Sequence, residues 1–345
     1  MNCHLLVPNL FWPESVGVEP YRELALPALE TLLARGTRRK HAGISLERWL
    51  ADAFRIAPQY DLPLAALALR GDGGEPGTGC WLQADPVHLK IHGDRPMLAD
   101  ASRFEITRQE ADELLAALNA HFAQDGLAFV APAPQRWYAR AHSEPRIRTT
   151  PTGEVAGRSV EHFLPAGDDS ARWRSIMNEA QMLLHQHPCN EAREARGELP
   201  INSVWFWGAG RLPEVARDAP YGTVWSDHPL AAGLAAATSV QCRALPESGE
   251  RLTEVAGDAA QDRPQLIIAD RLRRAACGDV QGWRAALVEL EQRWFTPLLD
   301  ALKRGAAVSV TLHALGPEYS LTSLSTRRDC FKFWRVARPL AAYAA

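Results

Sequence analysis

A short stretch beyond the middle of the chain places two glycines and an arginine directly after an apolar run. Its residues are Trp207, Gly208, Ala209, Gly210 and Arg211. Glycine lets backbone N–H groups approach an anion closely, and a guanidinium can pair with the same anion through parallel hydrogen bonds. The pattern therefore predicts a site for a phosphate-like group. A tight turn between packed tryptophans would explain the same residues, so both interpretations stay open.

Side chains that could hold a metal ion are few and scattered. Three candidates follow apolar runs late in the chain, namely Asp270, Asp279 and His313. Carboxylate and imidazole groups could bind a divalent cation together if the fold brought all three into contact. A single histidine at the end of a strand is more often a hydrogen-bonded core residue. The six cysteines are too widely spaced for a zinc or redox pair, so we expect buried thiols.

Three arginines, Arg271, Arg273 and Arg274, follow Asp270 almost without interruption. Positive side chains disfavour a divalent cation at the same place. The arginines could bind an acidic ligand or partner, or they could form a solvated face of a helix.

The bulk composition is that of a globular protein with an ordinary core. The chain has 345 residues, of which 46% are hydrophobic and 23% charged, and its net charge is −3. This charge gives no general reason to expect nucleic acid or an anionic membrane as partner. No apolar run approaches the about 20 residues that span a bilayer, and the N-terminus lacks the pattern of a signal peptide. We therefore expect a cytoplasmic protein.

The spacing of apolar residues predicts elements that alternate between strand and helix. We expect buried strands at 4–10, 202–207, 265–269 and 307–313, and helices at 24–35, 173–185, 230–237 and 283–303. Such alternation is typical of a mostly parallel sheet with helices on both faces, which places the chain in the α/β class.

A second, smaller α+β unit is predicted between the first and second of these strands. Short strands at 87–91 and 97–98 form a hairpin, and Thr107 and Glu110 have the spacing of a capping box before an amphipathic helix. Two more strands are expected at 127–130 and 137–140. Residues 143–170 are rich in proline, glycine and charge, and they are expected to form a surface loop.

Two stretches combine rare residues in a specific order and spacing. The first contains Asp85-Pro86-Val87-His88-Leu89, then Ser102-Arg103-Phe104-Glu105-Ile106-Thr107-Arg108-Gln109-Glu110-Ala111, and continues to Asn119. The second contains His187-Pro188-Cys189-Asn190, Arg193, Gly197, Pro200, Asn202 and the run from Trp205 through Gly208 and Gly210 to Pro213. Both stretches resemble the archaeal-type cofactor-independent phosphoglycerate mutases. The second is the more specific, because its rare residues keep the order and spacing of that family. Within this group the chain is most similar to the RpfE-type regulatory proteins.

The resemblance implies an alkaline-phosphatase-like core with an inserted subdomain. Residues 1–70 and 171–345 would form the core, and residues 71–170 the smaller α+β insertion. The same resemblance implies that Asn190 and Arg193 lie beside the glycine-rich stretch.

Enzymes of this superfamily hold two divalent metals through aspartate and histidine, and they use a serine or threonine nucleophile. The metals neutralise phosphate charge and lower the pKa of the attacking oxygen. The resemblance implies a first ligand in an Asp-Gly pair after the first strand, where this chain has Asn9-Leu10. Further on, arginines stand where the family has histidines, and Leu312 stands in place of the aspartate before His313. A two-metal site needs about six ligands, and this chain retains at most three weak candidates.

The sequence therefore predicts a non-catalytic regulatory or ligand-binding protein, a pseudoenzyme without cofactor, on a phosphoglycerate-mutase-like scaffold. Its candidate ligand-binding residues are Asn190, Arg193, Asn202, Trp207, Gly208, Gly210 and Arg211, and no catalytic residue is assigned. The expected partner is a phosphorylated small molecule or another protein, with neither nucleic acid nor membrane. The alternative is a metal-dependent mutase or phosphohydrolase with a rearranged site, in which Asp270, Asp279 and His313 hold two Mn or Zn ions.

Overall fold

The computed structural model describes residues 1–12, 19–93, 95–215, 218–255, 263–275 and 279–344. They form two compact units. Unit 1 comprises Met1–Trp49, Asp218–His228 and Thr238–Ala345, and unit 2 comprises Leu50–Arg217 and Pro229–Ala237. Unit 2 contains the stretch expected as an insertion, residues 71–170, and extends beyond it at both ends. The division into a core and an insertion stays a prediction.

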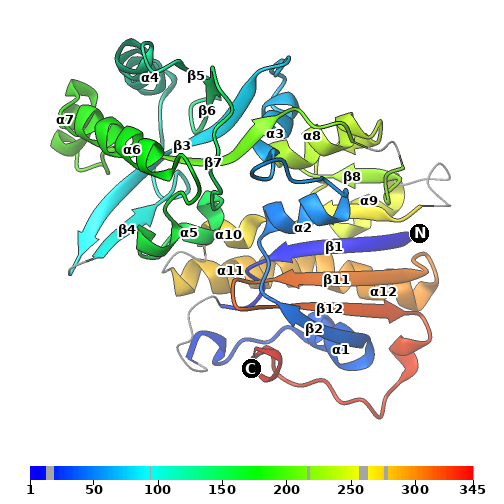
Figure 1. Ribbon diagram of the computed structural model, residues 1–345. Coiled ribbons are helices and arrows are strands. Elements are labelled where there is room, and N and C mark those ends of the chain that lie inside the picture. Colours follow the sequence, from blue (N-terminus) through cyan, green and yellow to red (C-terminus); the bar gives the residue numbers. More distant parts are fainter. Residues whose placement is uncertain (13–18, 94, 216–217, 256–262, 276–278, 345) are drawn as a thin grey trace. The chain divides into compact units, whose positions relative to one another are not determined.

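Unit 1 is built on a seven-stranded sheet with the order β2-β12-β11-β1-β10-β8-β9. The strands are β1 (Asn2–Pro8), β2 (Thr37–Ala42), β8 (Thr223–Trp225), β9 (Gln241–Arg243), β10 (Gln265–Ile268), β11 (Ser309–Leu315) and β12 (Tyr319–Thr326). Five neighbours from β11 to β9 are parallel, and β12 and β2 are antiparallel at one edge. Figure 1 shows β1, β11, β12 and β2 as successive neighbours. The predicted α/β class with a mostly parallel sheet is confirmed.

Helices flank this sheet and supply its core. They are α1 (Pro27–Arg35), α9 (Gly249–Val255), α10 (Arg271–Ala275), α11 (Val280–Leu290) and α12 (Thr296–Arg304), with short helices at Glu19–Tyr21, Asp329–Phe331 and Leu340–Tyr343. A π-helical turn, Glu291–Phe295, joins α11 to α12, so the long helix predicted at 283–303 is present. Cys3, Leu5 and Val7 of β1 belong to the same buried cluster as residues of α1, α11 and α12. Since side chains alternate along a strand, His4 of β1 faces the other side of the sheet.

Unit 2 is built on a five-stranded antiparallel sheet in which β3 is central. The order is β4-β3-β6-β5, and β7 also pairs with β3. The strands are β3 (Cys80–His92), β4 (Arg95–Ala99), β5 (Leu127–Ala133), β6 (Arg136–Ala141) and β7 (Ser203–Arg211). The helices are α3 (Leu64–Gly71), α4 (Arg108–Phe122), α5 (Thr152–Val155), α6 (Ser170–His185), α7 (Pro188–Ala195) and α8 (Pro229–Ala237). Helix α2 (Leu46–Ala53) begins in unit 1 and ends in unit 2.

A local signal predicted one detail of unit 2 correctly, and a glycine explains another. The capping box of α4 is formed, because Thr107 Oγ1 accepts a hydrogen bond from Glu110 N at 3.2 Å and Thr107 N donates to Glu110 Oε2 at 2.9 Å. Helix α8 packs tightly on α3 through glycine. A Cβ atom on Gly233 would lie 1.8 Å from Leu67 O, so only glycine permits this approach.

Two expectations about unit 2 were wrong. Residues 143–170 are more than a surface loop, because Ile147, Val155 and Val160 are buried and the stretch contains α5 and a short helix at Val160–Phe163. The glycine-rich stretch is no turn after a strand, because β7 continues to Arg211 and pairs with β3 through Arg211 and Cys80. No helix in the described ranges is long and apolar enough to cross a membrane.

Candidate functional site

The two glycines of β7 allow the strand to pack closely on Pro63 and the first residues of α3. Gly208 has φ 69°, and a Cβ atom there would lie 3.1 Å from the backbone nitrogen of Ala65. At Gly210 a Cβ atom would lie 2.5 Å from the side chain of Pro63. Positive φ and close approach both require glycine at 208. Packing alone therefore accounts for the glycines that predicted a phosphate site.

The backbone N–H of Gly208 is already hydrogen-bonded within unit 2. It donates to Thr149 Oγ1 at 2.9 Å, and the Thr149 hydroxyl donates to Asp61 Oδ2. Burial raises the pKa of Asp61, although these hydrogen bonds oppose the shift. An anion at Gly208 would have to displace the Thr149 hydroxyl.

A second aspartate–threonine pair holds the neighbouring residue of β7. Trp207 Nε1 donates to Asp85 Oδ2 at 2.7 Å, and the Thr152 hydroxyl donates to the same oxygen. Burial raises the pKa of Asp85 to about 6, and the hydrogen bonds from Thr152 and Trp207 lower it in part. Both threonines come from the stretch 143–170, so this stretch contributes polar groups to β7.

Arg211, at the end of β7, carries the charged side chain that was predicted to pair with an anion. Its side chain is 48% exposed, and Nε lies 3.5 Å from Glu144 Oε2. Its guanidinium also donates to Thr78 O, and its backbone N–H donates to Gln59 Oε1 at 2.9 Å. This guanidinium can reorient toward an anion at modest cost, because pairs between exposed side chains are weak.

The remaining candidate ligand residues serve the scaffold of unit 2. Asn190 donates to Leu184 O and Ile201 O and accepts from Ile201 N. Arg193 is 1% exposed and donates to Glu110 Oε2 at 2.9 Å and to the carbonyl oxygens of Leu199 and Glu105. Asn202 pairs with both backbone groups of Leu89. These described contacts join α7 and the chain before β7 to α4 and β3, and none of them reaches residues 207–211.

In unit 1 the candidate region for a ligand is at the carboxyl ends of the parallel strands, because open α/β sheets bind ligands there. We call this region the carboxyl edge of unit 1. Asn9 follows β1, and its backbone pairs with Leu315 of β11 and with the indole of Trp283. His228 follows β8, and α10 follows β10 after Asp270.

A buried ion pair lies at the carboxyl edge of unit 1. Arg273 Nη2 of α10 is 2.8 Å from Glu47 Oε1 of α2, and Glu47 is 2% exposed. Arg273 Nη1 also lies 3.4 Å from His228 Nε2. Burial raises the pKa of Glu47, but attraction to Arg273 and His228 outweighs it and holds the pKa below its usual value. Arg273 therefore does not belong to a solvated face, since it neutralises a buried carboxylate.

The three candidate metal ligands have separate roles. Asp279 caps α11, since its Oδ1 accepts from Gly282 N at 2.8 Å. Asp270 accepts the Arg273 N–H through its backbone carbonyl at 3.0 Å. His313 is buried in β11, and burial, together with His4 and His41, lowers its pKa to about 3. Among the described residues no three His, Cys, Asp or Glu side chains form a group that could hold a metal ion. The donor set does not fit a two-metal centre.

A pair of histidines was missed by the sequence analysis. His4 Nδ1 and His313 Nε2 share a hydrogen bond of 3.0 Å on the sheet face opposite the helical core cluster. The rings stack at 5.1 Å, and Trp49 and Tyr221 lie against them. The available signal was that both histidines interrupt apolar strands at positions that alternate with core residues.

Comparison with known proteins relates part of the chain to one family. The family model described as 2,3-bisphosphoglycerate-independent phosphoglycerate mutase matches residues 85–190. The enzyme of that name from Methanosarcina mazei is 26% identical over 201 residues, which are 54% of this chain and 49% of that protein. The one from Methanosarcina barkeri is 29% identical over 119 residues, or 34% of this chain and 30% of that protein. The chain spans about half, or less, of the length of these curated relatives.

Solved structures show the same relationship at the level of the fold. A cofactor-independent phosphoglycerate mutase from Thermoplasma acidophilum superimposes with a TM-score of 0.51 at 16% identity, covering 100% of this chain and 95% of that one. The PH0037 protein from Pyrococcus horikoshii gives a TM-score of 0.50 at 11% identity, covering 94% and 87%. The fold is therefore alkaline-phosphatase-like, and the chain is a divergent relative of the cofactor-independent phosphoglycerate mutases.

The family-model match falls entirely within unit 2. It includes Glu110 and Asn190, whose hydrogen bonds hold that unit together. The residues that carry this likeness are thus explained by the scaffold, and the carboxyl edge of unit 1 lies outside the match.

Proposed function

We propose that the chain is a non-catalytic, cytoplasmic regulatory or ligand-binding protein of the RpfE type on a phosphoglycerate-mutase-like scaffold. One observation carries the proposal: the carboxyl edge of unit 1 holds the buried ion pair between Arg273 and Glu47. The pair lies at the edge where such sheets bind ligands. Its guanidinium neutralises the carboxylate that a divalent cation would otherwise need there.

The contacts of the candidate metal ligands in unit 1 support the same proposal. A metal-dependent phosphoryl transfer needs carboxylates and imidazoles that converge on open coordination positions. Here the carboxylate of Glu47 is committed to Arg273, that of Asp279 to the end of a helix, and the ring of His313 to His4. Metal binding by these residues would require each of these contacts to break.

A phosphorylated small molecule remains the proposed ligand, with β7 of unit 2 as its contact. Arg211 supports this, because its guanidinium is half exposed and its ion pair with Glu144 joins two exposed side chains and is therefore weak. The N–H of Gly208 would join it only after Thr149 had moved. A protein partner is the other proposed regulator, and both would act without metal.

The experiment that tests the lack of catalysis is calorimetric titration of the metal-free protein with Mn²⁺ and Zn²⁺. It is followed by mutase and phosphatase assays in the presence of each metal. The Methanosarcina mazei enzyme serves as positive control. We expect neither specific metal binding nor turnover. Binding of two equivalents together with turnover would overturn the proposal and favour the metal-dependent mutase or phosphohydrolase.

A variant pair makes this test sharper. Arg273→Met removes the cation at the carboxyl edge, whereas Arg271→Met removes an arginine of the same helix that pairs with the exposed Glu289. If the arginine merely blocks a working metal site, only Arg273→Met will gain metal binding and turnover. We expect that neither variant gains turnover, because Asp279 and His313 are committed to other contacts.

A further inference from the structure

One edge of the unit 1 sheet is formed by a short, strongly basic strand. β2 stands at one end of the strand order, and all six of its residues are exposed. It carries Arg38, Arg39 and Lys40 in succession. Charged residues on an edge strand prevent pairing with another copy of the same strand, so a second copy of this chain is disfavoured as the occupant of this edge.

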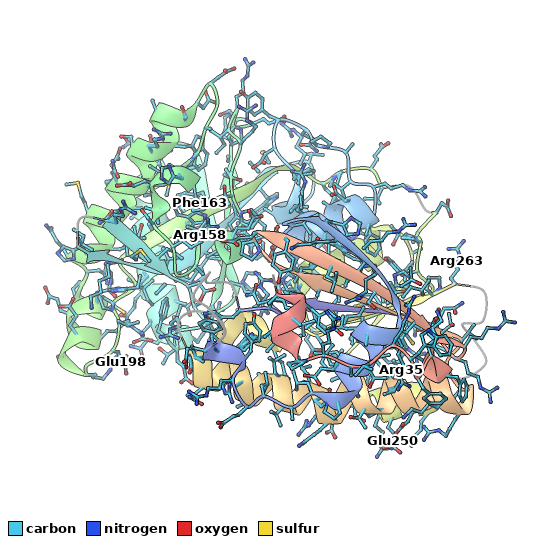
Figure 2. All side chains as sticks on the ribbon, turned by 90° about the horizontal axis from the view of Figure 1, so that it is seen from below. Arg35, Arg158, Phe163, Glu198, Glu250 and Arg263 are labelled. Atoms are coloured by element: carbon cyan, nitrogen blue, oxygen red, sulfur yellow. The ribbon has the colours of Figure 1, made fainter. Side chains whose placement is uncertain are left out.

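The segment that follows β12 lies beside the start of β2. Arg335 Nη1 donates to Arg35 O at 3.2 Å and to Gly36 O at 3.1 Å, and Arg35 Nη1 donates to Cys330 O at 2.5 Å. The Arg38 guanidinium lies 4.9 Å from the ring centre of Tyr343. Residues 35–41 and 327–338 therefore form one surface, which we call the basic edge. Figure 1 shows the second stretch as the red chain between β12 and the C-terminus, and Figure 2 labels Arg35.

Cations far outnumber acids within the residues of the basic edge. The cations are Arg35, Arg38, Arg39 and Lys40 in the first stretch, and Arg327, Arg328, Lys332, Arg335 and Arg338 in the second. The acid within these stretches is Asp329, which is 8% exposed and lies 2.5 Å from Lys332 Nζ. The net charge of −3 averages over the whole chain, and it does not reveal this concentration.

Large apolar side chains project from the same segment. Phe331, Phe333, Trp334 and Val336 are 51%, 68%, 76% and 75% exposed. The segment is held at both ends, because Cys330 is 5% and Leu340 1% exposed and Leu340 N donates to Glu30 Oε1. Exposed apolar groups in such a cluster mark an interaction site more often than isolated ones do.

We propose that the basic edge binds the surface of an anionic lipid bilayer. Peripheral attachment is stable when two signals act together, an apolar insertion and a polybasic patch, and both are present here. Transfer of phenylalanine and tryptophan side chains from water into the interface between lipid headgroups and acyl chains is favourable. Each lysine or arginine close to anionic headgroups strengthens binding by about fivefold.

Single-stranded nucleic acid is the competing occupant, and the apolar residues weigh against it. Bases stack on open aromatic faces, but the Arg35 guanidinium lies 5.2 Å from the ring centre of Phe333 and covers one face. Val336 is aliphatic and offers no stacking surface for a base, but transfer of its side chain into a bilayer is favourable. The combination therefore favours lipid.

The test is sedimentation of the full chain with vesicles of phosphatidylcholine alone and with added phosphatidylglycerol, at constant salt. We expect binding to the anionic vesicles only. Arg39→Gln and Arg328→Gln should each weaken binding about fivefold, and Trp334→Ser with Val336→Ser should abolish it.

Lys90→Gln and Ile91→Ser are matched controls, because they alter an exposed cation and an exposed apolar residue of unit 2. All these side chains are exposed, so circular dichroism and melting temperature should not change.

A second readout places the apolar residues in the lipid. Brominated acyl chains should quench part of the tryptophan fluorescence of the bound protein, and Trp334→Phe should remove that quenching while retaining binding. Failure to bind anionic vesicles would overturn the proposal. The proposal would also be overturned if vesicles were not bound but a single-stranded oligonucleotide was, and the arginine variants weakened that binding.

Discussion

Replacing Arg273 by methionine is expected to destabilise unit 1 by about 3 kcal/mol at neutral pH. The variant leaves the carboxylate of Glu47 in a site that is 2% exposed, without the guanidinium that lies 2.8 Å away. Breaking a buried pair by removing one partner costs about 3–5 kcal/mol. The lower end applies because the Arg273 side chain is 22% exposed and because the attraction between Glu47 and His228 remains in the variant.

The pH dependence of this loss has a definite sign. In the wild type the folded pKa of Glu47 is held below its unfolded value, so its contribution to stability is present at neutral pH and lost as the pH falls through the folded pKa. In the variant, burial dominates and raises the folded pKa, so the carboxyl group takes up a proton as the pH falls. The difference between the two proteins should therefore shrink from pH 7 to pH 4.5.

Urea unfolding at pH 7 and pH 4.5, followed by circular dichroism, measures this difference. Arg271→Met is the control, because its pair with Glu289 is exposed and should contribute at most about 1 kcal/mol. The double variant Glu47→Leu/Arg273→Met should recover most of the stability, since buried ion pairs can be replaced by apolar residues at little cost. An Arg273→Met variant as stable as the wild type at pH 7, or a loss that does not change with pH, would refute this account of the ion pair.

Three further predictions concern unit 2. Gly233→Ala should destabilise the unit by about 3 kcal/mol, because its Cβ would overlap Leu67 O; Ala236→Ser, at an exposed position of the same helix, should leave the melting temperature unchanged. Ionisation of Asp85, whose folded pKa is raised to about 6, should cost stability as the pH rises from 4 to 6. Asp85→Asn should flatten that part of the urea-midpoint profile, and a profile as steep as that of the wild type would contradict the raised pKa. Phosphoglycerate should raise the melting temperature of the wild type but not of Arg211→Gln, and equal stabilisation of both would remove Arg211 from the proposed ligand site.

Elements whose signal is local could be predicted from the sequence. The apolar periodicities of β1, α6 and the joined α11 and α12 identified them because each buries one face or stripe against a core. The capping box of α4 is local in the same sense, since its two residues are three positions apart. The mostly parallel sheet followed from the alternation of such elements.

Strand β2 and the role of the glycines in β7 could not be predicted in this way. β2 is exposed along its whole length, so no alternation marks it, and it forms only because β12 supplies hydrogen bonds from far along the chain. The glycine-rich stretch has the composition of a turn. It remains a strand because β3 pairs with it and because Ala65 and Pro63 approach its glycines.

The sequence by itself determined which side chains this protein has available, including an arginine-rich run after β10 and few metal ligands. The tertiary structure decided what those side chains do. Arg273 meets Glu47, and His4 meets His313 across 309 positions of the chain. Such pairs depend on which strands become neighbours, and that order arises from the packing of the whole sheet. No short window of sequence contains both members of either pair, so only the folded chain reveals them.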